Sequence, residues 1–257
     1  MKKLVLAVMM TMALSTTALA QKRVTNIYAS SPKLDLELMQ NSEQTVQLKR
    51  YFFAGYNTLC LPFSLTADQV ATVAKDLRVE RLAGIHQQGE TLNLYFVDCT
   101  SDGIQAGVPY LVYSPTSQYL CVRNNEVLNI GAELKAVRMS DDNGNTVTFG
   151  SSWESMEKMG RYGIPAKQDV TPLESILIKT NADKTFLPTR CGFTWDQQAP
   201  SVSNLEIKHA TMGEVTAIMG IAQDNAAGGN YYDLQGRKLT KTSKGLRIQD
   251  GKKTISK

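Results

Sequence analysis

The sequence predicts a mainly all-β protein that is β-sandwich-like, with one or two short packed helices and a small C-terminal β-hairpin. Two observations favour this fold class. Many short apolar runs alternate with polar residues at a period of two, which is typical of half-buried strands. Turn-forming residues separate these runs, and only two segments after residue 20 have the apolar spacing of a helix.

The first expected strands precede residue 64. Residues 34–38 alternate leucine with acidic side chains, and residues 45–48 form a second alternating run. The most distinctive run spans residues 55–63, in which leucines 59 and 61 and the final phenylalanine would share one strand face. Pro62 has no N–H to donate to a neighbouring strand, so it marks an edge or an end of this strand.

The strongest helix signal follows this run. Thr66 and Gln69 have the spacing of a capping box, in which each side chain accepts a hydrogen bond from a backbone N–H of the first turn. Apolar residues then recur at helical spacing as far as Leu77, so one face should pack on the preceding strand. A weaker helix is expected over residues 152–159, ended by Gly160.

The remaining runs are predicted to be strands joined by turns. Residues 87–90 form a turn before the alternating run 92–96. Asn143 and Gly144 separate two apolar runs and predict a hairpin, because both residue types tolerate positive φ. The other expected strands are residues 108–113, 134–139, 146–149, 176–178, 193–195 and 205–207.

Residues 1–20 are predicted to be a secretory signal peptide. They open with two lysines, continue with an apolar run over residues 4–14, and end in Ala-Leu-Ala, a typical cleavage site. The apolar run is shorter than the roughly 20 residues that span a bilayer, so no transmembrane segment is expected. We therefore expect an exported protein, in the periplasm, at the outer surface or secreted, whose mature chain begins at Gln21.

Composition excludes several other classes of protein. Hydrophobic residues make up 42% and charged residues 20% of the 257 residues, which is too apolar a balance for a disordered chain. Lys and Arg total 28 against 24 Asp and Glu, a net charge of +4. Removing the two lysines of the signal segment leaves 26 against 24, or +2. So small a charge argues against a nucleic-acid partner.

The cysteines leave two alternatives open. Oxidation in an exported protein would give two disulfides, in any of three pairings. Burial as unpaired thiols is the other alternative, because a chain of this length needs no cross-link to build a core. The four candidates are Cys60, Cys99, Cys121 and Cys191.

The end of the chain is expected to form a separate unit. Gly, Ala, Asn and Gln dominate residues 211–230, which predicts a linker. Beyond it, residues 232–238 and 246–249 would pair as a hairpin. The predicted organisation is a signal peptide over 1–20, a β-rich exported module over 21–210, a linker over 211–230 and a C-terminal hairpin over 231–257.

This C-terminal segment resembles the sorting domain of the type IX secretion pathway, which many secreted Bacteroidota proteins carry. The shared pattern is a tyrosine-aspartate strand, a glycine turn with a basic residue, and a glycine before the second strand. The matching positions are Tyr232, Asp233, Gly236, Arg237, Gly245 and Gly251. The resemblance implies a sorting signal, and the alternative is a hairpin that only packs on the sandwich.

A second resemblance covers residues 55–112. Asn-Thr-Leu-Cys-Leu-Pro-Phe at 57–63, a helix, a β-hairpin and Ala-Gly-Val-Pro-Tyr-Leu at 106–111 follow one another. This succession is similar to a repeat unit of large surface proteins of the same bacteria. The resemblance implies an extracytoplasmic β module and carries over no catalytic residue.

No motif predicts a catalytic, cofactor or metal site. Cys60 and His209 are a conceivable nucleophile pair, although a thiol within an apolar strand tends to be buried and inert. The acidic run 141–145 lacks the ligand spacing of a calcium loop. Aromatic residues are candidates to stack on sugar rings, although core positions are their commoner role. These candidates are Tyr51, Phe52, Phe53, Trp153 and Trp195.

These observations predict an exported, non-enzymatic binding or structural protein of a Gram-negative envelope, with a glycan or a protein as its surface ligand and no cofactor. The alternatives are a carbohydrate-binding accessory protein and a hydrolase with an unrecognised site. An enzyme should have a deep pocket with convergent polar groups, whereas a carbohydrate binder should expose coplanar aromatic rings.

Overall fold

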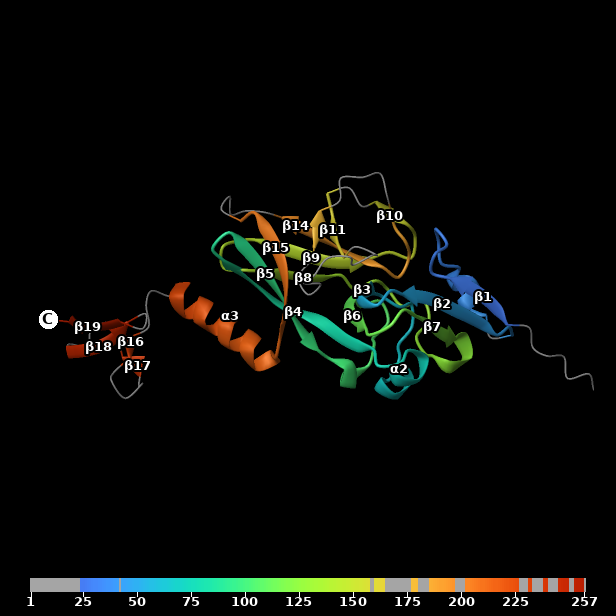
Figure 1. The fold of residues 1–257 in the computed structure, drawn as a ribbon, viewed down its shortest axis with the longest axis horizontal. Coiled ribbons are helices and arrows are strands. Elements are labelled where there is room, and N and C mark those ends of the chain that lie inside the picture. The colour runs from blue at the N-terminus through green and yellow to red at the C-terminus, as the bar shows by residue number, and fades with distance from the viewer. Residues whose placement is uncertain are drawn as a thin grey trace, which may run out of the picture.

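The computed structural model describes residues 24–41, 43–157, 160–164, 177–179, 185–196 and 202–226, and the strands at 231–232, 238–239, 245–249 and 252–256. The expected signal peptide lies outside the described residues. Most elements are strands, and they form two five-stranded sheets and three smaller ones (Figure 1). The expectation of a mainly all-β, sandwich-like fold is confirmed.

The central sheet has the strand order β15-β5-β4-β6-β3. Its strands are β3 (Gly55–Leu59), β4 (Arg78–Gln88), β5 (Thr91–Asp98), β6 (Tyr110–Ser114) and β15 (Asn204–Ala210). β4 and β5 pair as an antiparallel hairpin whose turn contains Gly89 at a φ of 61°. The predicted turn over 87–90 is confirmed for residues 89–90, whereas residues 87 and 88 belong to β4. β15 returns to pair with β5 in parallel.

The second five-stranded sheet has the order β12-β11-β14-β9-β8. Its strands are β8 (Val137–Ser140), β9 (Thr146–Ser151), β11 (Tyr162–Gly163), β12 (Ile178–Lys179) and β14 (Cys191–Asp196). β8 and β9 form the hairpin that the Asn-Gly pair predicts. In its turn the Asp141 carboxylate accepts from the backbone N–H groups of Asn143 and Asn145, at 3.0 and 2.8 Å, so this acidic run closes a turn.

The two five-stranded sheets share an apolar core. Phe96 of the central sheet meets the rings of Phe149 and Phe193 edge-on, at centroid distances of 5.8 and 6.2 Å. Phe149 and Phe193 stack on each other at 4.3 Å across β9 and β14. All three rings are fully buried, which fixes the two sheets face to face.

A three-stranded sheet with the order β1-β2-β7 lies beside the sandwich. Its strands are β1 (Thr25–Tyr28), β2 (Val46–Phe52) and β7 (Gln118–Arg123), and the 3-10 turn η2 (Asn124–Glu126) follows β7. The other 3-10 turn, η1 (Thr100–Asp102), follows β5 of the central sheet. The expected strand 45–48 is confirmed as part of β2, whereas β1 and β7 were not foreseen. A two-stranded pair joins β10 (Met156–Glu157) to β13 (Thr185–Phe186).

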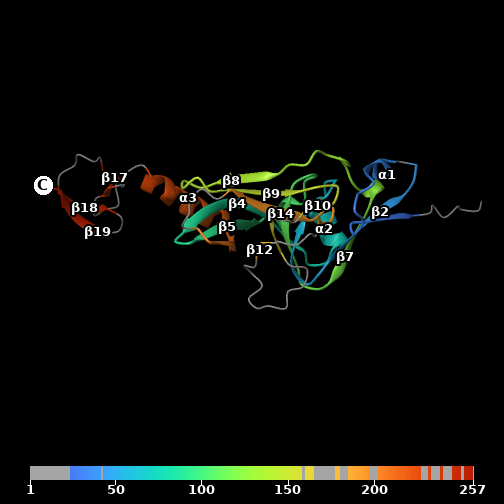
Figure 2. The ribbon, with the colours of Figure 1, turned by 90° about the horizontal axis from the view of Figure 1, so that it is seen from above.

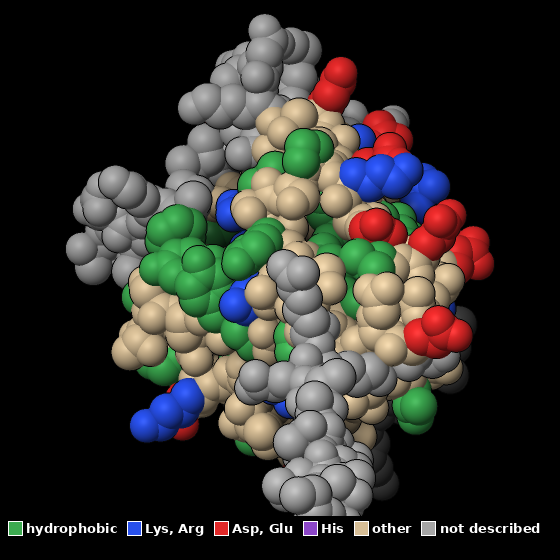
Figure 3. Space-filling view, turned by 90° about the vertical axis from the view of Figure 1, so that its right-hand side faces the viewer, with side chains coloured by type: hydrophobic (Ala, Val, Ile, Leu, Met, Phe, Trp, Pro, Cys, Tyr) green, Lys and Arg blue, Asp and Glu red, His purple; other side chains and the backbone are tan. Residues whose placement is uncertain are grey.

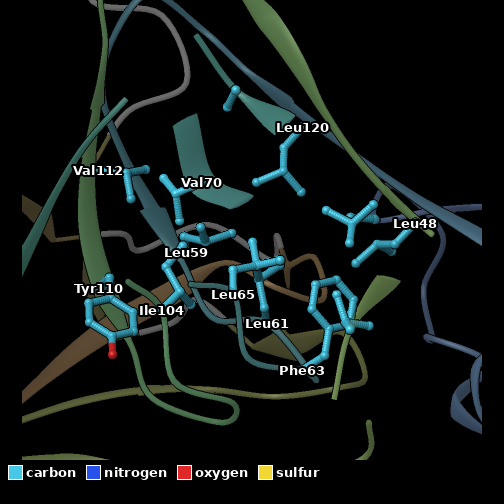
Figure 4. Close-up of a cluster of buried hydrophobic side chains, with 14 of the residues drawn as sticks. Leu48, Leu59, Leu61, Phe63, Leu65, Val70, Ile104, Tyr110, Val112 and Leu120 are labelled. Atoms are coloured by element: carbon cyan, nitrogen blue, oxygen red, sulfur yellow. The ribbon is translucent and has the colours of Figure 1, made fainter. Parts of the chain in front are cut away.

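Helix α2 (Ala67–Val73) packs under this part of the fold as the sequence predicts. The capping box is present, since Gln69 N donates to Thr66 Oγ1 at 3.2 Å and Thr66 N donates to Gln69 Oε1 at 2.8 Å. Leu61 and its neighbours in the run 55–63 are fully buried and lie around Val70 (Figure 4). The predicted packing of strand on helix is therefore confirmed.

Two of the elements expected before residue 160 are wrong. Residues 34–38 do not form a strand, because Asp35 caps a short helix, α1 (Leu36–Gln40), by accepting from Leu38 N at 2.8 Å. Residues 152–157 do not form a helix. Lys33 pairs with Glu154 in a β-bridge, and β10 pairs with β13, so tertiary pairing overrides the local helical spacing.

The expected linker over 211–230 is wrong for most of its length, because helix α3 spans Met212–Ala226. Thr211 and Glu214 form a second reciprocal cap, since Glu214 N donates to Thr211 Oγ1 at 3.2 Å and Thr211 N donates to Glu214 Oε2 at 2.7 Å. Val215 is buried against Tyr95 and Val97 of β5, which docks the start of α3 on the central sheet.

The C-terminal strands form a small sheet and not a single hairpin. The strands β16 (Tyr231–Tyr232), β17 (Lys238–Leu239), β18 (Gly245–Gln249) and β19 (Lys252–Ser256) have the order β17-β16-β18-β19. In two perpendicular views this sheet lies beyond α3, at the opposite end of the molecule from β1 and β2 (Figures 1 and 2). Tyr232 and Gly245 lie on strands, whereas the other residues of the sorting-like pattern lie outside the described residues.

Candidate functional site

The candidate site begins with an arginine at a core position of β2. Alternate residues of β2 face inward, and Arg50 takes one of these positions, where the others are apolar. Its side chain is 3% exposed. Nη1 donates to the carbonyl oxygen of Tyr51 at 2.6 Å and Nη2 to that of Thr58 at 3.3 Å, while the buried Nε has no acceptor. A buried charge of this kind is costly unless it is paired.

A second guanidinium comes from the residue that precedes β14. Arg190 is partly buried, and its Nε is also buried without an acceptor. The preceding residue, Thr189, has a φ of 67°, a left-handed conformation that β-branched residues rarely adopt. Such backbone strain is maintained only where the surrounding structure fixes it, often beside functional side chains.

Strand β3 holds the two arginines together. Cys191 N donates to Thr58 Oγ1 at 2.8 Å, and this hydroxyl donates back to Cys191 O at 3.1 Å. Cys60 directly follows β3, and its N–H donates to Thr189 O at 2.9 Å, which fixes the strained residue. Because the carbonyl of Thr58 also accepts from Arg50, one short segment positions both guanidinium groups.

Without a bound anion, the guanidinium groups of Arg50 and Arg190 are desolvated and repel each other. Burial, followed by the positive charge of Arg190, lowers the pKa of Arg50 to about 9. Burial likewise lowers the pKa of Arg190. Within the described part of the chain, no carboxylate forms an ion pair with either group. An anion placed between them would relieve both the desolvation and the repulsion.

Both arginines line a cavity of about 220 Å³. It lies where β1 ends, because Tyr28 is the last residue of β1 to pair with β2, opposite Lys49. Lys49 adds a third basic group to the lining, and Ser30 adds a hydroxyl. The end of the molecule that carries β1 and β2 shows a hydrophobic patch with basic atoms in and beside it, while acidic side chains lie mainly on the other side of this view (Figure 3).

Aromatic rings form the rest of the cavity wall. Tyr51 lies 5.1 Å from the ring of Phe53 at an interplanar angle of 88°, and 4.9 Å from that of Tyr119 at 60°. Tyr119 and Tyr28, which also lines the cavity, are 53% and 44% exposed. The rings therefore form an aromatic corner, and the coplanar platform on which an extended carbohydrate chain would lie is not formed at this cavity.

The aromatic candidates from the sequence divide between the cavity and the core. Tyr51 and Phe53 line the cavity, whereas Phe52 is fully buried on the opposite face, as strand alternation requires. Trp153 and Trp195 are partly buried and pack against the apolar clusters of the sandwich. Neither tryptophan is part of the cavity wall.

All four cysteines are unpaired in the structure. Cys60, Cys99 and Cys191 are buried, and Cys121 is partly exposed. Burial raises the pKa of Cys60 to about 12 and that of Cys99 to about 11, and it raises the pKa of Cys191 well above the ordinary value. These thiols are poor nucleophiles at neutral pH, because the thiolate is the reactive form.

The nucleophile pair considered from the sequence is not formed. His209 contacts Glu80, with 2.7 Å between Nδ1 and Oε2, and its ring stacks on Tyr56 at 4.7 Å. Cys60 lies against the Ser151 hydroxyl instead. Across the described ranges, no group of three or more His, Cys, Asp or Glu side chains is arranged to hold a metal ion.

Sequence reasoning missed both arginines. For Arg50 a signal was present, because the run Val-x-Leu-x-Arg-x-Phe over 46–52 alternates at a period of two and puts a charge where a core residue belongs. The expected strand ended at residue 48, so this signal at Arg50 was overlooked. For Arg190 no local pattern predicts the site, since only the fold brings it to β3.

Comparison with known proteins gives no relative to guide the interpretation: no family model matches the chain, and no curated protein or solved structure matches it. No described helix has the length and apolar character needed to cross a membrane.

Proposed function

We propose that this is an exported, non-enzymatic binding protein of a Gram-negative envelope, which holds an anionic ligand in the cavity of Arg50 and Arg190. One observation carries the proposal. Two guanidinium groups share a cavity, each keeps a buried Nε without an acceptor, and no described carboxylate compensates them. Arginine is suited to this role because its planar fork matches the oxygens of a carboxylate, sulfate or phosphate.

The energetic argument favours binding over a purely structural role. Burying an unpaired charge costs several kcal/mol, and an apolar side chain of similar size usually serves a core better. The other inward-facing positions of β2 carry apolar side chains, so Arg50 is the one charged residue among the core positions of this strand. A destabilising residue at a cavity is a typical mark of a functional site.

Export is supported by the sequence at both ends of the chain. The segment 1–20 has the pattern of a secretory signal peptide, and the segment 231–257 resembles a type IX sorting domain. The protein would thus meet its ligand in the periplasm, at the outer surface or in the medium. A protein ligand with an acidic group is the alternative to a small anion.

The test is anion-dependent stabilisation of the mature protein. Sulfate should raise the melting temperature at constant ionic strength, since a ligand at 100 times its Kd stabilises the native state by about 2.7 kcal/mol. Arg190→Gln should abolish the increase, whereas Arg138→Gln, at an exposed position on β8, should retain it. If sulfate stabilised the native protein and both variants equally, the increase in melting temperature would be a non-specific effect of the salt, and the proposal would be rejected.

A further inference from the structure

We infer that the cavity takes one acidic sugar unit, whose carboxylate or sulfate lies between Arg50 and Arg190 and whose ring lies against Tyr51 and Tyr119. The inference rests on the proposed function and deepens it by naming the ligand class. Its basis is the division of the cavity into a buried cationic part and an exposed aromatic part.

The size of the cavity favours a single ring. About 220 Å³ equals the volume of roughly seven waters, at ~30 Å³ each. That space exceeds the need of a bare sulfate or phosphate, yet it lies below the ~300 Å³ at which sites for drug-sized ligands begin. One pyranose ring with one charged substituent matches it.

The charged part of the cavity specifies an anionic group with several oxygens. Arg50 and Arg190 both line the cavity, and no described carboxylate forms an ion pair with either guanidinium group. A carboxylate or a sulfate has several charged oxygens, so it can accept from two separate guanidinium groups and compensate their charge, whereas a hydroxyl carries no charge. A neutral sugar would leave the buried charges uncompensated.

The aromatic part specifies more than a bare anion. The ring of Tyr51 lies about 5 Å from the rings of Phe53 and Tyr119. The faces of these rings form an apolar surface, for which an inorganic ion has no complementary group. A sugar ring has C–H faces that pack on aromatic rings and hydroxyls that stay wet. Tyrosine at a partly exposed wall suits such a ligand, because its ring is apolar and its hydroxyl end is polar. The angle between the rings fits one sugar seated in a corner better than a chain lying on a flat platform.

Calorimetric titration of the mature protein tests the inference with four probes: glucuronate, glucose 6-sulfate, glucose and inorganic sulfate. At least one of the two acidic sugars should bind about tenfold or more tighter than either glucose or sulfate, which corresponds to one charge-assisted hydrogen bond. The comparison between the two acidic sugars identifies a carboxylate or a sulfate as the preferred group.

Variants separate the two parts of the cavity. Tyr119→Ala should weaken binding of the acidic sugar about two- to tenfold and leave sulfate binding unchanged, whereas Tyr119→Phe should bind nearly as the native protein does. Arg190→Gln should weaken both ligands about 10- to 100-fold. Leu128→Ala removes a 76%-exposed apolar side chain that is not part of the cavity, and it should change neither affinity.

These experiments distinguish failure of the sugar inference from failure of the proposed anion-binding function. Sulfate binding as tightly as both acidic sugars, with no effect of Tyr119→Ala, would overturn the sugar inference and leave the proposed anion site standing. No binding of any anion by a folded protein would reject the proposed function and the inference together. Tighter binding of glucose than of either acidic sugar would overturn the inference and contradict the cationic site.

Discussion

His209 Nδ1 lies 2.7 Å from Oε2 of Glu80, which joins two residues that are 129 positions apart in the sequence. The other carboxylate oxygen of Glu80 forms an ion pair with Arg78 at 2.8 Å. Arg78 also donates a hydrogen bond to the hydroxyl of Tyr56, whose ring stacks on His209. The buried Glu80 therefore ties β15 to β4 and β3 across the central sheet.

Glu80→Gln should lower the free energy of unfolding by about 1–3 kcal/mol, because it removes the charge to which two partners are oriented. The matched control is Glu154→Gln, since Glu154 pairs with Lys33 at an exposed site and should contribute at most about 1 kcal/mol. Urea unfolding of both variants measures the difference. Equal losses would show that the Glu80 network adds nothing beyond a surface ion pair.

Leu61→Ala should cost about 2–5 kcal/mol, because Leu61 is fully buried among the strand and helix residues of the core around α2. The same truncation at the exposed Leu128 should cost little. Chemical denaturation of the two variants tests the difference. A near-zero effect of Leu61→Ala would contradict the packing of the 55–63 run on α2.

The elements that the sequence predicted correctly depend on signals within a few residues. The Thr66–Gln69 cap, the turn at Gly89 and the Asn143-Gly144 hairpin are each set by local backbone chemistry. The errors arise where two local signals compete. Leucines alternate over 34–38, but Asp35 between them is a better helix cap than a strand residue.

In helix α3, too, two local sequence signals compete, here over a longer segment. The Gly- and Ala-rich composition of 211–230 is typical of a linker, yet Thr211 and Glu214 have capping-box spacing and Val215 supplies the buried contact.

The candidate site was harder to predict from the sequence than any of these elements. Arg50 has a signal in the alternation of β2, whereas Arg190 reaches the cavity only because β14 is fastened to β3 by Thr58.

The cysteines should react in a defined order. In the native protein a thiol reagent should label Cys121 first, because the other three are buried and burial raises the pKa of each of them. Denaturation without reductant should then expose four free thiols. Mass spectrometry of the alkylated protein counts them, and a count of none would establish two disulfides in place of the unpaired thiols.

Arg50→Met should separate stability from binding. In buffer free of multivalent anions, the variant should melt at a temperature at least equal to that of the native protein, because Met fills the core position without an uncompensated charge. In sulfate the order should reverse, since only the native protein gains from ligand binding. Thermal melts in the two buffers test the reversal, with Arg138→Met as the control for losing an exposed arginine. Strong destabilisation in both buffers would assign Arg50 a structural role.

Sulfate binding should weaken as pH rises through about 9, where Arg50 loses its charge. The sign follows from the lowered pKa: the folded protein releases this proton below the ordinary value of 12.5, so the charge that attracts the anion is present at neutral pH and is lost above about 9. The same deprotonation relieves the buried charge, so the stability of the ligand-free native protein relative to Arg50→Met should increase over that range. Calorimetric titration of sulfate and paired unfolding curves from neutral pH upward measure the two effects. Sulfate affinity that stays constant through pH 9 would place the bound anion away from Arg50.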